Sequence, residues 1–132
     1  MTRVIDNVSY ARDLFVEKRI FRRVGEYVIE RETMDTILGL FLTGDIPEDI
    51  TVTLDDNKCF NVILPTSMQT AKKFIRLRTF SFLKAYKYKI SRGKVFITNI
   101  NAYAIIKFLS AGTEYKDIIF NEEDNTYTLI RF

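Results

Sequence analysis

Residues 60–75, FNVILPTSMQTAKKFI, set out a pattern that returns in residues 95–109, VFITNINAYAIIKFL. In both stretches an apolar run rich in β-branched residues is followed by a polar residue able to cap a helix, and then by apolar residues at helical spacing. A further strand-like run precedes each stretch, and a short polar turn connects it to the first residues of the stretch. The sequence therefore predicts two successive β-hairpins, each followed by a helix, as a weak internal duplication.

Alternation along the hairpins predicts which side of the sheet each side chain occupies. The polar positions are Thr51, Thr53, Asn61, Lys87 and Lys89. The apolar positions are Ile50, Val52, Leu54, Phe60, Val62, Tyr86, Tyr88 and Ile90. We expect helices to cover the apolar face, and water or a partner to cover the polar face.

Two helices are expected before the hairpins. Residues 8–22 have apolar residues at helical spacing, with Asn7 as the cap and Gly25 as the end, and residues 26–31 suggest a short strand or an extended link. From Thr33 to Gly44 the apolar residues surround nearly the whole circumference of a helix, so that helix should be buried on most sides.

These elements predict an α+β fold with a mainly antiparallel sheet and helices on one face. The order is an N-terminal helix, a buried helix, ββαββα and a C-terminal hairpin. We expect the 132 residues to form one domain. Its parts are residues 1–32 with the N-terminal helix and extended segment, 33–112 with the αββαββα core, and 113–132 with the hairpin.

The composition excludes several kinds of site. The chain has no histidine and a single cysteine, Cys59, so an intrachain disulfide, a histidine base and a Cys/His zinc site are all excluded. We expect no cofactor. Residues 1–9 show no signal-peptide pattern, and no run of about 18 apolar residues predicts a membrane span, so we expect no membrane contact and a cytoplasmic, intracellular location.

The charges are strongly segregated along the chain. Residues 57–113 contain eleven Lys or Arg and no Asp or Glu. A clustered positive field is what a phosphate backbone or an acidic protein surface requires. The segment therefore predicts nucleic-acid binding between residues 58 and 107, with DNA favoured. The expected binding residues are Lys72, Lys73, Arg76, Arg78, Lys84, Lys87, Lys89, Arg92 and Lys94.

Two tyrosines lie among these cations. Tyr86 and Tyr88 alternate with Lys87 and Lys89, so they should point to the opposite side of the strand. We therefore expect them to pack in the core instead of stacking on bases.

Residues 33–111 resemble a degenerate LAGLIDADG homing-endonuclease domain. The resemblance rests on the buried helix with ILGLFLTGD at residues 37–45 and on the ββαββα order that follows. It implies a saddle-shaped sheet that binds DNA. The family has a metal-binding acid five residues after the internal glycine; here that position is Gly44, and Asp45 follows it, so no catalytic residue carries over.

Three alternatives remain open. One is metal-dependent nuclease chemistry on the acidic residues Asp45, Glu48, Asp49, Asp55 and Asp56. A solvated loop and a turn explain the same residues better. Another is a small viral or phage-encoded inhibitor whose basic face docks on a host protein. The third is a homodimer that joins basic and acidic halves. We expect a non-enzymatic protein.

Overall fold

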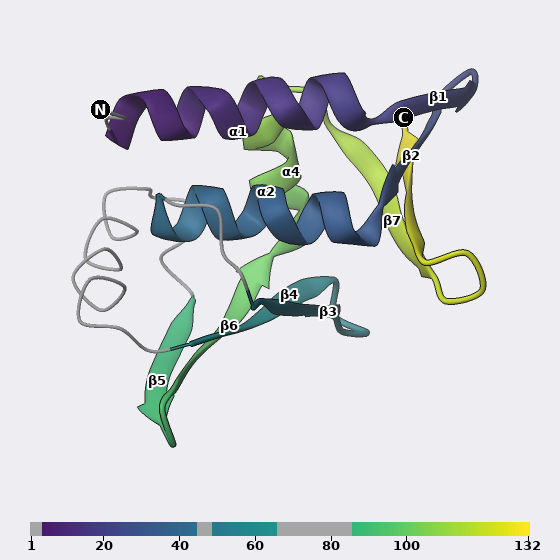
Figure 1. The fold of residues 1–132 in the computed structure, drawn as a ribbon. Helices are drawn as coiled ribbons and strands as arrows, with labels where there is room; N and C mark the ends of the chain where they lie inside the picture. The colour runs from purple at the N-terminus through teal and green to yellow at the C-terminus, as the bar shows by residue number, and fades with distance from the viewer. Residues whose placement is uncertain (1–3, 45–48, 66–85) are drawn as a thin grey trace.

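The computed structural model describes residues 4–44, 49–65 and 86–132 (Figure 1). The helices in these ranges are α1 (Val4–Lys18), α2 (Arg31–Thr43) and α4 (Ala102–Leu109). None of them is both long and apolar enough to span a bilayer. The strands are β1 (Ile20–Arg23), β2 (Glu26–Glu30), β3 (Thr51–Leu54), β4 (Cys59–Pro65), β5 (Lys87–Ser91), β6 (Lys94–Asn101), β7 (Tyr115–Asn121) and β8 (Thr126–Arg131).

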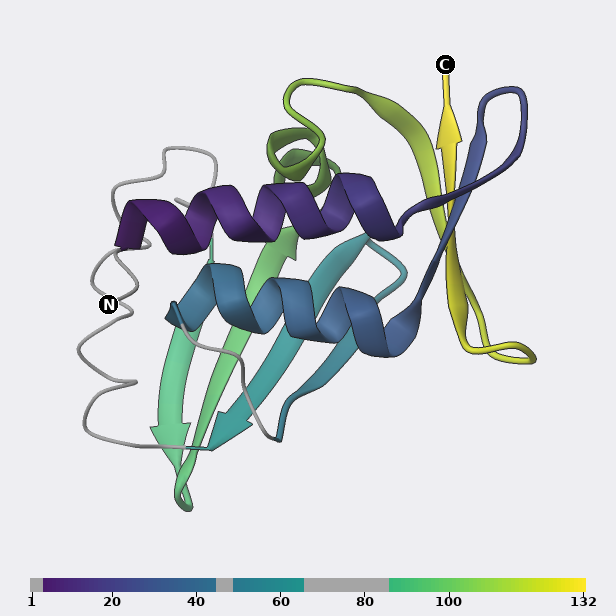
Figure 2. The same cartoon turned by 45° about the horizontal axis from the view of Figure 1, so that its top comes forward.

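The described strands form two four-stranded antiparallel sheets. Sheet A has the order β1-β2-β8-β7, and sheet B has the order β3-β4-β6-β5. Each sheet consists of two hairpins that meet through their second strands, because β2 pairs with β8 and β4 pairs with β6. Figure 2 shows α2 lying across one face of sheet B. The predicted α+β class with antiparallel strands is confirmed, whereas the division into two sheets was not foreseen.

The N-terminal helix differs from its predicted bounds. Instead of running from residue 8 to residue 22, α1 ends at Lys18, and Ile20–Arg23 forms β1. Gly25, with φ of 77°, lies in the turn between β1 and β2 and does not end a helix. Asn7 lies inside α1 and is not its cap. The strand forms because β2 offers it a partner, and the ring of Phe21 packs 6.0 Å from that of Tyr27.

Helix α2 is the most buried element of the described chain. It begins at Arg31, two residues before Thr33, the first residue of the predicted helix, and Glu30 at its N-cap makes no side-chain capping bond. It ends as predicted at Gly44, which has φ of 84° and donates its N–H to the Leu40 carbonyl at 2.8 Å. Glycine suits this position because it adopts left-handed backbone without strain.

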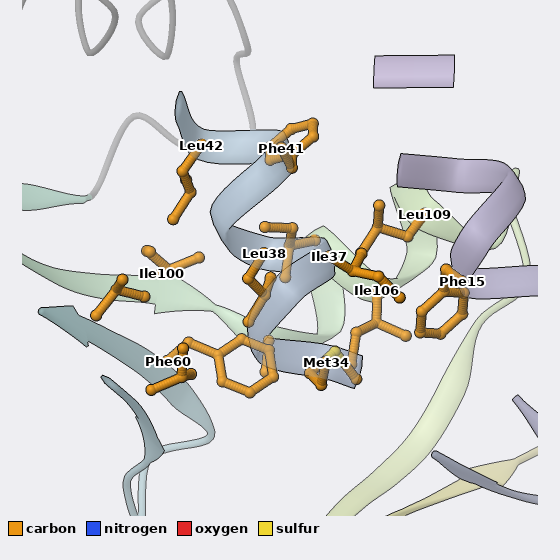
Figure 3. Packing of buried hydrophobic residues seen from close by; sticks show 14 of the residues in the cluster. Phe15, Met34, Ile37, Leu38, Phe41, Leu42, Phe60, Ile100, Ile106 and Leu109 are labelled. Atoms are coloured by element: carbon orange, nitrogen blue, oxygen red, sulfur yellow. The ribbon is translucent and has the colours of Figure 1, made fainter. Parts of the chain in front are cut away.

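Side chains from both sheets and both other helices surround α2. Figure 3 shows Phe60 and Ile100 of sheet B on one side of it, and Ile106 and Leu109 of α4 with Phe15 of α1 on the other. All five side chains are fully buried. The expectation of a helix buried on most sides is therefore confirmed. Helix α4 also begins as predicted, because Asn101 Oδ1 accepts a hydrogen bond from the Ala104 N–H at 3.0 Å.

One carboxylate, that of Asp35, is buried along with α2. Its Oδ2 accepts a hydrogen bond from Arg31 Nη1 at 3.0 Å, while its Oδ1 has no hydrogen-bond partner in the described structure. Burial raises the pKa of Asp35 to about 6, although the nearby Arg31 opposes that rise. The same carboxylate adds to the effect of burial in raising the pKa of Tyr127. Asp35 therefore makes the fold sensitive to pH.

Stability should increase as the pH falls through the pKa of Asp35. The folded chain holds this proton to higher pH than the unfolded chain, where the pKa is 3.8. Linkage then gives about 1 kcal/mol more unfolding free energy at pH 5 than at pH 8 from this group. We expect Asp35→Asn to remove that increment in urea unfolding curves. The control is Asp13→Asn, which changes an exposed carboxylate on α1 and should leave the stability increment unchanged. An unchanged pH dependence in Asp35→Asn would show that another group is responsible.

Candidate nucleic-acid interface

The face of sheet B that points away from α2 is the candidate site, and we call it the outer face of sheet B. Val52 pairs with Val62 and Leu54 with Phe60 on the core side, so the residues between them face outward. The outer face carries Thr51, Thr53, Asn61, Ile63, Lys87, Lys89, Lys94, Phe96 and Thr98. Each of these side chains is partly or largely exposed. The polar face predicted from alternation is therefore confirmed.

The outer face is organised in rows that cross all four strands. One row runs from Thr51 through Ile63 and Phe96 to Lys89. Lys89 Nζ lies 5.7 Å from the centroid of the Phe96 ring, within the range of a cation–π contact. The parallel row ends on Lys87, which pairs with Thr98. The cations thus gather at the β5 edge, beside an apolar centre.

A bulge in β6 keeps this face separate from the core. Phe60 pairs with Ile100 and Val62 with Ile97, so Asn61 lies opposite both Thr98 and Asn99. Asn99 has φ of 61°, a conformation that Asn adopts more readily than most residues with a Cβ. The extra residue turns Ile100 back to the core, where it is fully buried.

Four of the predicted binding residues lie together in the described structure. Lys87, Lys89 and Lys94 are exposed on the outer face of sheet B, and Arg92 is exposed in the turn between β5 and β6. Arg92 and Gly93 both have positive φ, 52° and 72°, as in the tight turns that suit twisted hairpins. None of the four cations has an ion-pair partner among the residues that the structure describes.

The other five predicted binding residues lie outside the described residues. They are Lys72, Lys73, Arg76, Arg78 and Lys84.

Two other cations of the carboxylate-free segment are already neutralised. Lys58 Nζ lies 3.1 Å from Asp117 Oδ1, and this contact lowers the pKa of Asp117. The same nitrogen donates a 2.6 Å hydrogen bond to the Ile118 carbonyl. Lys107 Nζ lies 2.7 Å from Glu114 Oε1, and this hydrogen bond lowers the pKa of Glu114. The segment is thus continuous in sequence but divided in space, because these two lysines pair with carboxylates and the β5–β6 cations do not.

Tyr88 of β5 and Tyr86, the residue before that strand, follow the prediction only in part. Tyr88 pairs with Ile97 and so lies on the core side of sheet B, as expected. However, Tyr88 is 46% exposed, and β5 is an edge strand of sheet B. Tyr86 is partly buried against the core, and its ring stacks 6.4 Å from that of Tyr88. The prediction therefore gave the correct side of the sheet for Tyr88 but was wrong about how deeply this residue is buried.

The carboxylate of Asp55 has a structural task in the β3–β4 turn. Its Oδ1 accepts hydrogen bonds from the N–H groups of Asn57 and Cys59, at 2.9 and 3.0 Å, and its Oδ2 accepts one from Asn61 Nδ2 at 3.1 Å. The Cys59 N–H is the main cause of the lowered pKa of Asp55, followed by Asn61. These contacts explain an aspartate at this position without a metal.

The other acidic residues considered for metal chemistry do not extend this site. Asp49 and Asp56 are exposed, while Asp45 and Glu48 lie outside the described residues. In the three described ranges, no group of three or more His, Cys, Asp or Glu residues is placed to hold a metal ion. Asp49 instead lines a cavity of about 80 Å³ with Lys94 and Pro65 at one margin of the outer face.

The position that resembles the acidic end of the LAGLIDADG motif is accounted for by helix geometry. Gly44, five residues after Gly39, forms the left-handed C-cap of α2 described above. A residue with a Cβ would be strained there. Asp45, the next residue, lies outside the described ranges.

Sequence reasoning missed the apolar centre of the outer face. Ile63 and Phe96 are partly exposed neighbours on β4 and β6, and Thr98 continues the same side of β6. Val95, Phe96, Ile97 and Thr98 alternate between the two faces of the sheet. Three of them are apolar, however, and an unbroken apolar run does not reveal which positions face outward.

Comparisons of this chain with protein-family models, with curated proteins and with solved structures found no match. The function must therefore be inferred from the surface itself.

Replacing Asp55 tests the structural role of its carboxylate. We expect Asp55→Ala to lower the free energy of unfolding by about 1–3 kcal/mol, because the N–H groups of Asn57 and Cys59 lose their acceptor. Asp55→Asn keeps one oxygen and should lose less. Urea unfolding at neutral pH measures both, with the exposed neighbour Asp56→Ala as control. Equal stability of all three variants would contradict a turn held by Asp55.

Proposed function

We propose that this protein binds nucleic acid without catalysis, and that DNA is its preferred ligand, through the outer face of sheet B. The proposal is carried by one observation: four exposed cations, Lys87, Lys89, Arg92 and Lys94, share a hairpin and have no ion-pair partner among the described residues. An exposed cation without a carboxylate partner is free to neutralise a phosphate, and the release of counterions then favours binding.

The arrangement of these cations suits a repeating anion. Lys87 and Lys89 are two residues apart on one strand, so their Cα atoms are separated by about 7 Å on the same side. Lys94 lies on the neighbouring strand, opposite Ser91. Such a short positive track follows a phosphate backbone more readily than it encloses a small anion, since an enclosed anion needs convergent donors.

The composition of the face supports a polymer ligand over a compact one. Thr98 pairs with Lys87, and Thr51, Thr53 and Asn61 lie on the same face, on β3 and β4. Their hydroxyl and amide groups are able to hydrogen-bond phosphate and sugar oxygens. The resemblance to a LAGLIDADG homing-endonuclease domain implies DNA as the ligand and makes duplex DNA the first probe. Sequence-independent backbone contacts are the expected mode, because most of these groups are Lys, Thr and Asn.

Removing two of the cations should weaken binding in a salt-dependent manner. We expect the double change Lys87→Ala and Lys89→Ala to lower affinity for duplex DNA roughly 10- to 60-fold at about 0.1 M salt. The slope of log affinity against log salt should become shallower by about 2. Fluorescence anisotropy with labelled single- and double-stranded DNA and RNA, at several salt concentrations, measures both quantities.

The matched control removes two charges from elsewhere. Lys107→Ala with Lys116→Ala changes exposed lysines on α4 and β7, and Lys107 belongs to the same carboxylate-free segment of sequence. This control should bind like the unchanged protein if position in space, and not net charge, determines affinity. No binding by the folded protein at low salt contradicts the proposal. In that event the same face is to be tested against an acidic host protein, the partner expected of a small viral or phage inhibitor, by pull-down.

A further inference from the structure

Sheet A also has a face that points away from the core, and its chemistry differs from that of sheet B. A row formed by Ile20, Val28, Thr128 and Ile119 crosses all four strands. Ile20 is 59% exposed and Ile119 is 37% exposed, while Val28 is partly buried. Ile130 adds a further partly buried apolar side chain in the next row. We call this surface the outer face of sheet A.

The opposite side of the same sheet carries core residues. Ile29, Ile118, Tyr127 and Leu129 are all buried there. Sheet A therefore has one buried face, and the exposed isoleucines lie on the other face. They lie on the two outer strands of the sheet, on either side of Val28, which is partly buried, and Thr128, which is 6% exposed.

The two ends of this face carry opposite charges. At the β1–β2 turn, Arg22 and Arg23 both pair with Glu26, at 3.1 and 2.7 Å, so two cations share one carboxylate and a positive charge remains. At the β7–β8 turn, residues 122–124 read Glu-Glu-Asp and are all exposed.

The register of sheet A places these turns at opposite ends of the strands. The Arg131 N–H donates to the Gly25 carbonyl at 2.8 Å, next to the basic turn. The Arg31 N–H donates to the Asn125 carbonyl at 3.0 Å, next to the acidic turn. Figure 2 shows the two turns at opposite ends of the sheet. The face is therefore basic at one end, apolar in the middle and acidic at the other end.

We propose that the outer face of sheet A binds a second copy of this chain, face to face, about a two-fold axis that runs along the row from Ile20 to Ile119. Rotation about that axis lays the apolar row of one copy on the same row of the other. It also reverses the strand direction, so the basic end of each copy lies over the acidic end of its partner. A two-fold interface must be self-complementary, and this distribution of charge and apolar surface meets that condition.

The size of the face sets the expected strength. Four strands at about 4.8 Å spacing, each with about five residues in register, give a patch of roughly 20 by 17 Å. That is smaller than the roughly 800 Å² per partner of a standard stable interface. The dimer should therefore be weak, and its population should depend strongly on concentration.

Sedimentation equilibrium of the full chain, freed of nucleic acid, tests the proposal between about 1 and 300 μM. We expect a monomer–dimer equilibrium that the double change Ile20→Lys and Ile119→Lys weakens at least tenfold. The control is Val16→Lys, which places a charge at a 46% exposed apolar residue on α1 and should leave the equilibrium unchanged. Circular dichroism checks that each variant is folded.

A second variant tests the orientation and does not depend on the tolerance of the sheet for lysine. Glu122→Lys with Glu123→Lys reverses charge in an exposed turn, so like charges would face each other across the axis. We expect weaker association, and higher salt should weaken the unchanged dimer as well. A monomer at every concentration, a larger closed oligomer, or a dimer indifferent to both double variants would overturn the proposal.

Discussion

The burial of α2 is the constraint on which the other elements depend. Nine consecutive or near-consecutive residues of this helix are buried, including Asp35, so it needs cover on every side. Sheet B covers one side with Phe60 and Ile100, and α1 and α4 cover the other with Phe15, Ile106 and Leu109 (Figure 3). Because a helix that is apolar all round is stable in water only inside such a shell, both sheets are left with their second faces directed outward. The candidate surfaces of the protein are a consequence of how α2 is enclosed.

A small polar contact joins the two sheets around that core. Lys58, at the β3–β4 turn, reaches the Ile118 carbonyl and the Asp117 carboxylate of β7, and Tyr103 of α4 donates to the same carboxylate at 3.4 Å. The backbone carbonyl of Lys58 also accepts the Ala102 N–H at 3.0 Å, where α4 begins. One residue thus connects sheet B, α4 and sheet A. Its charge is used within the fold, which explains why a lysine count over the sequence overstates the positive charge available to a ligand.

Local signals in the sequence predicted most elements, and pairing between distant segments accounts for the errors. Alternation identified the hairpins of sheet B, and Asn101 and Gly44 fixed one end each of α4 and α2, because capping acts within a few residues. Residues 20–22 were placed in a helix, since their strand exists only through pairing with β2, which itself pairs with β8 at the other end of the chain. On the candidate interface, alternation placed Lys87 and Lys89 correctly. It missed Phe96, because an apolar run does not reveal which of its residues face outward.

The two outer faces differ in a way that follows from where carboxylates occur along the chain. Both strands of the β5–β6 hairpin come from the segment without Asp or Glu, so the cations of sheet B have no neighbouring carboxylate from that hairpin. Sheet A draws its strands from the acidic and mixed segments at either side, and there Arg22 and Arg23 find Glu26. A face whose cations lack carboxylate partners attracts a highly charged polymer, whereas a face whose two ends carry opposite charges suits a protein surface. Since the two faces belong to different sheets, one kind of contact does not require surface that the other kind uses.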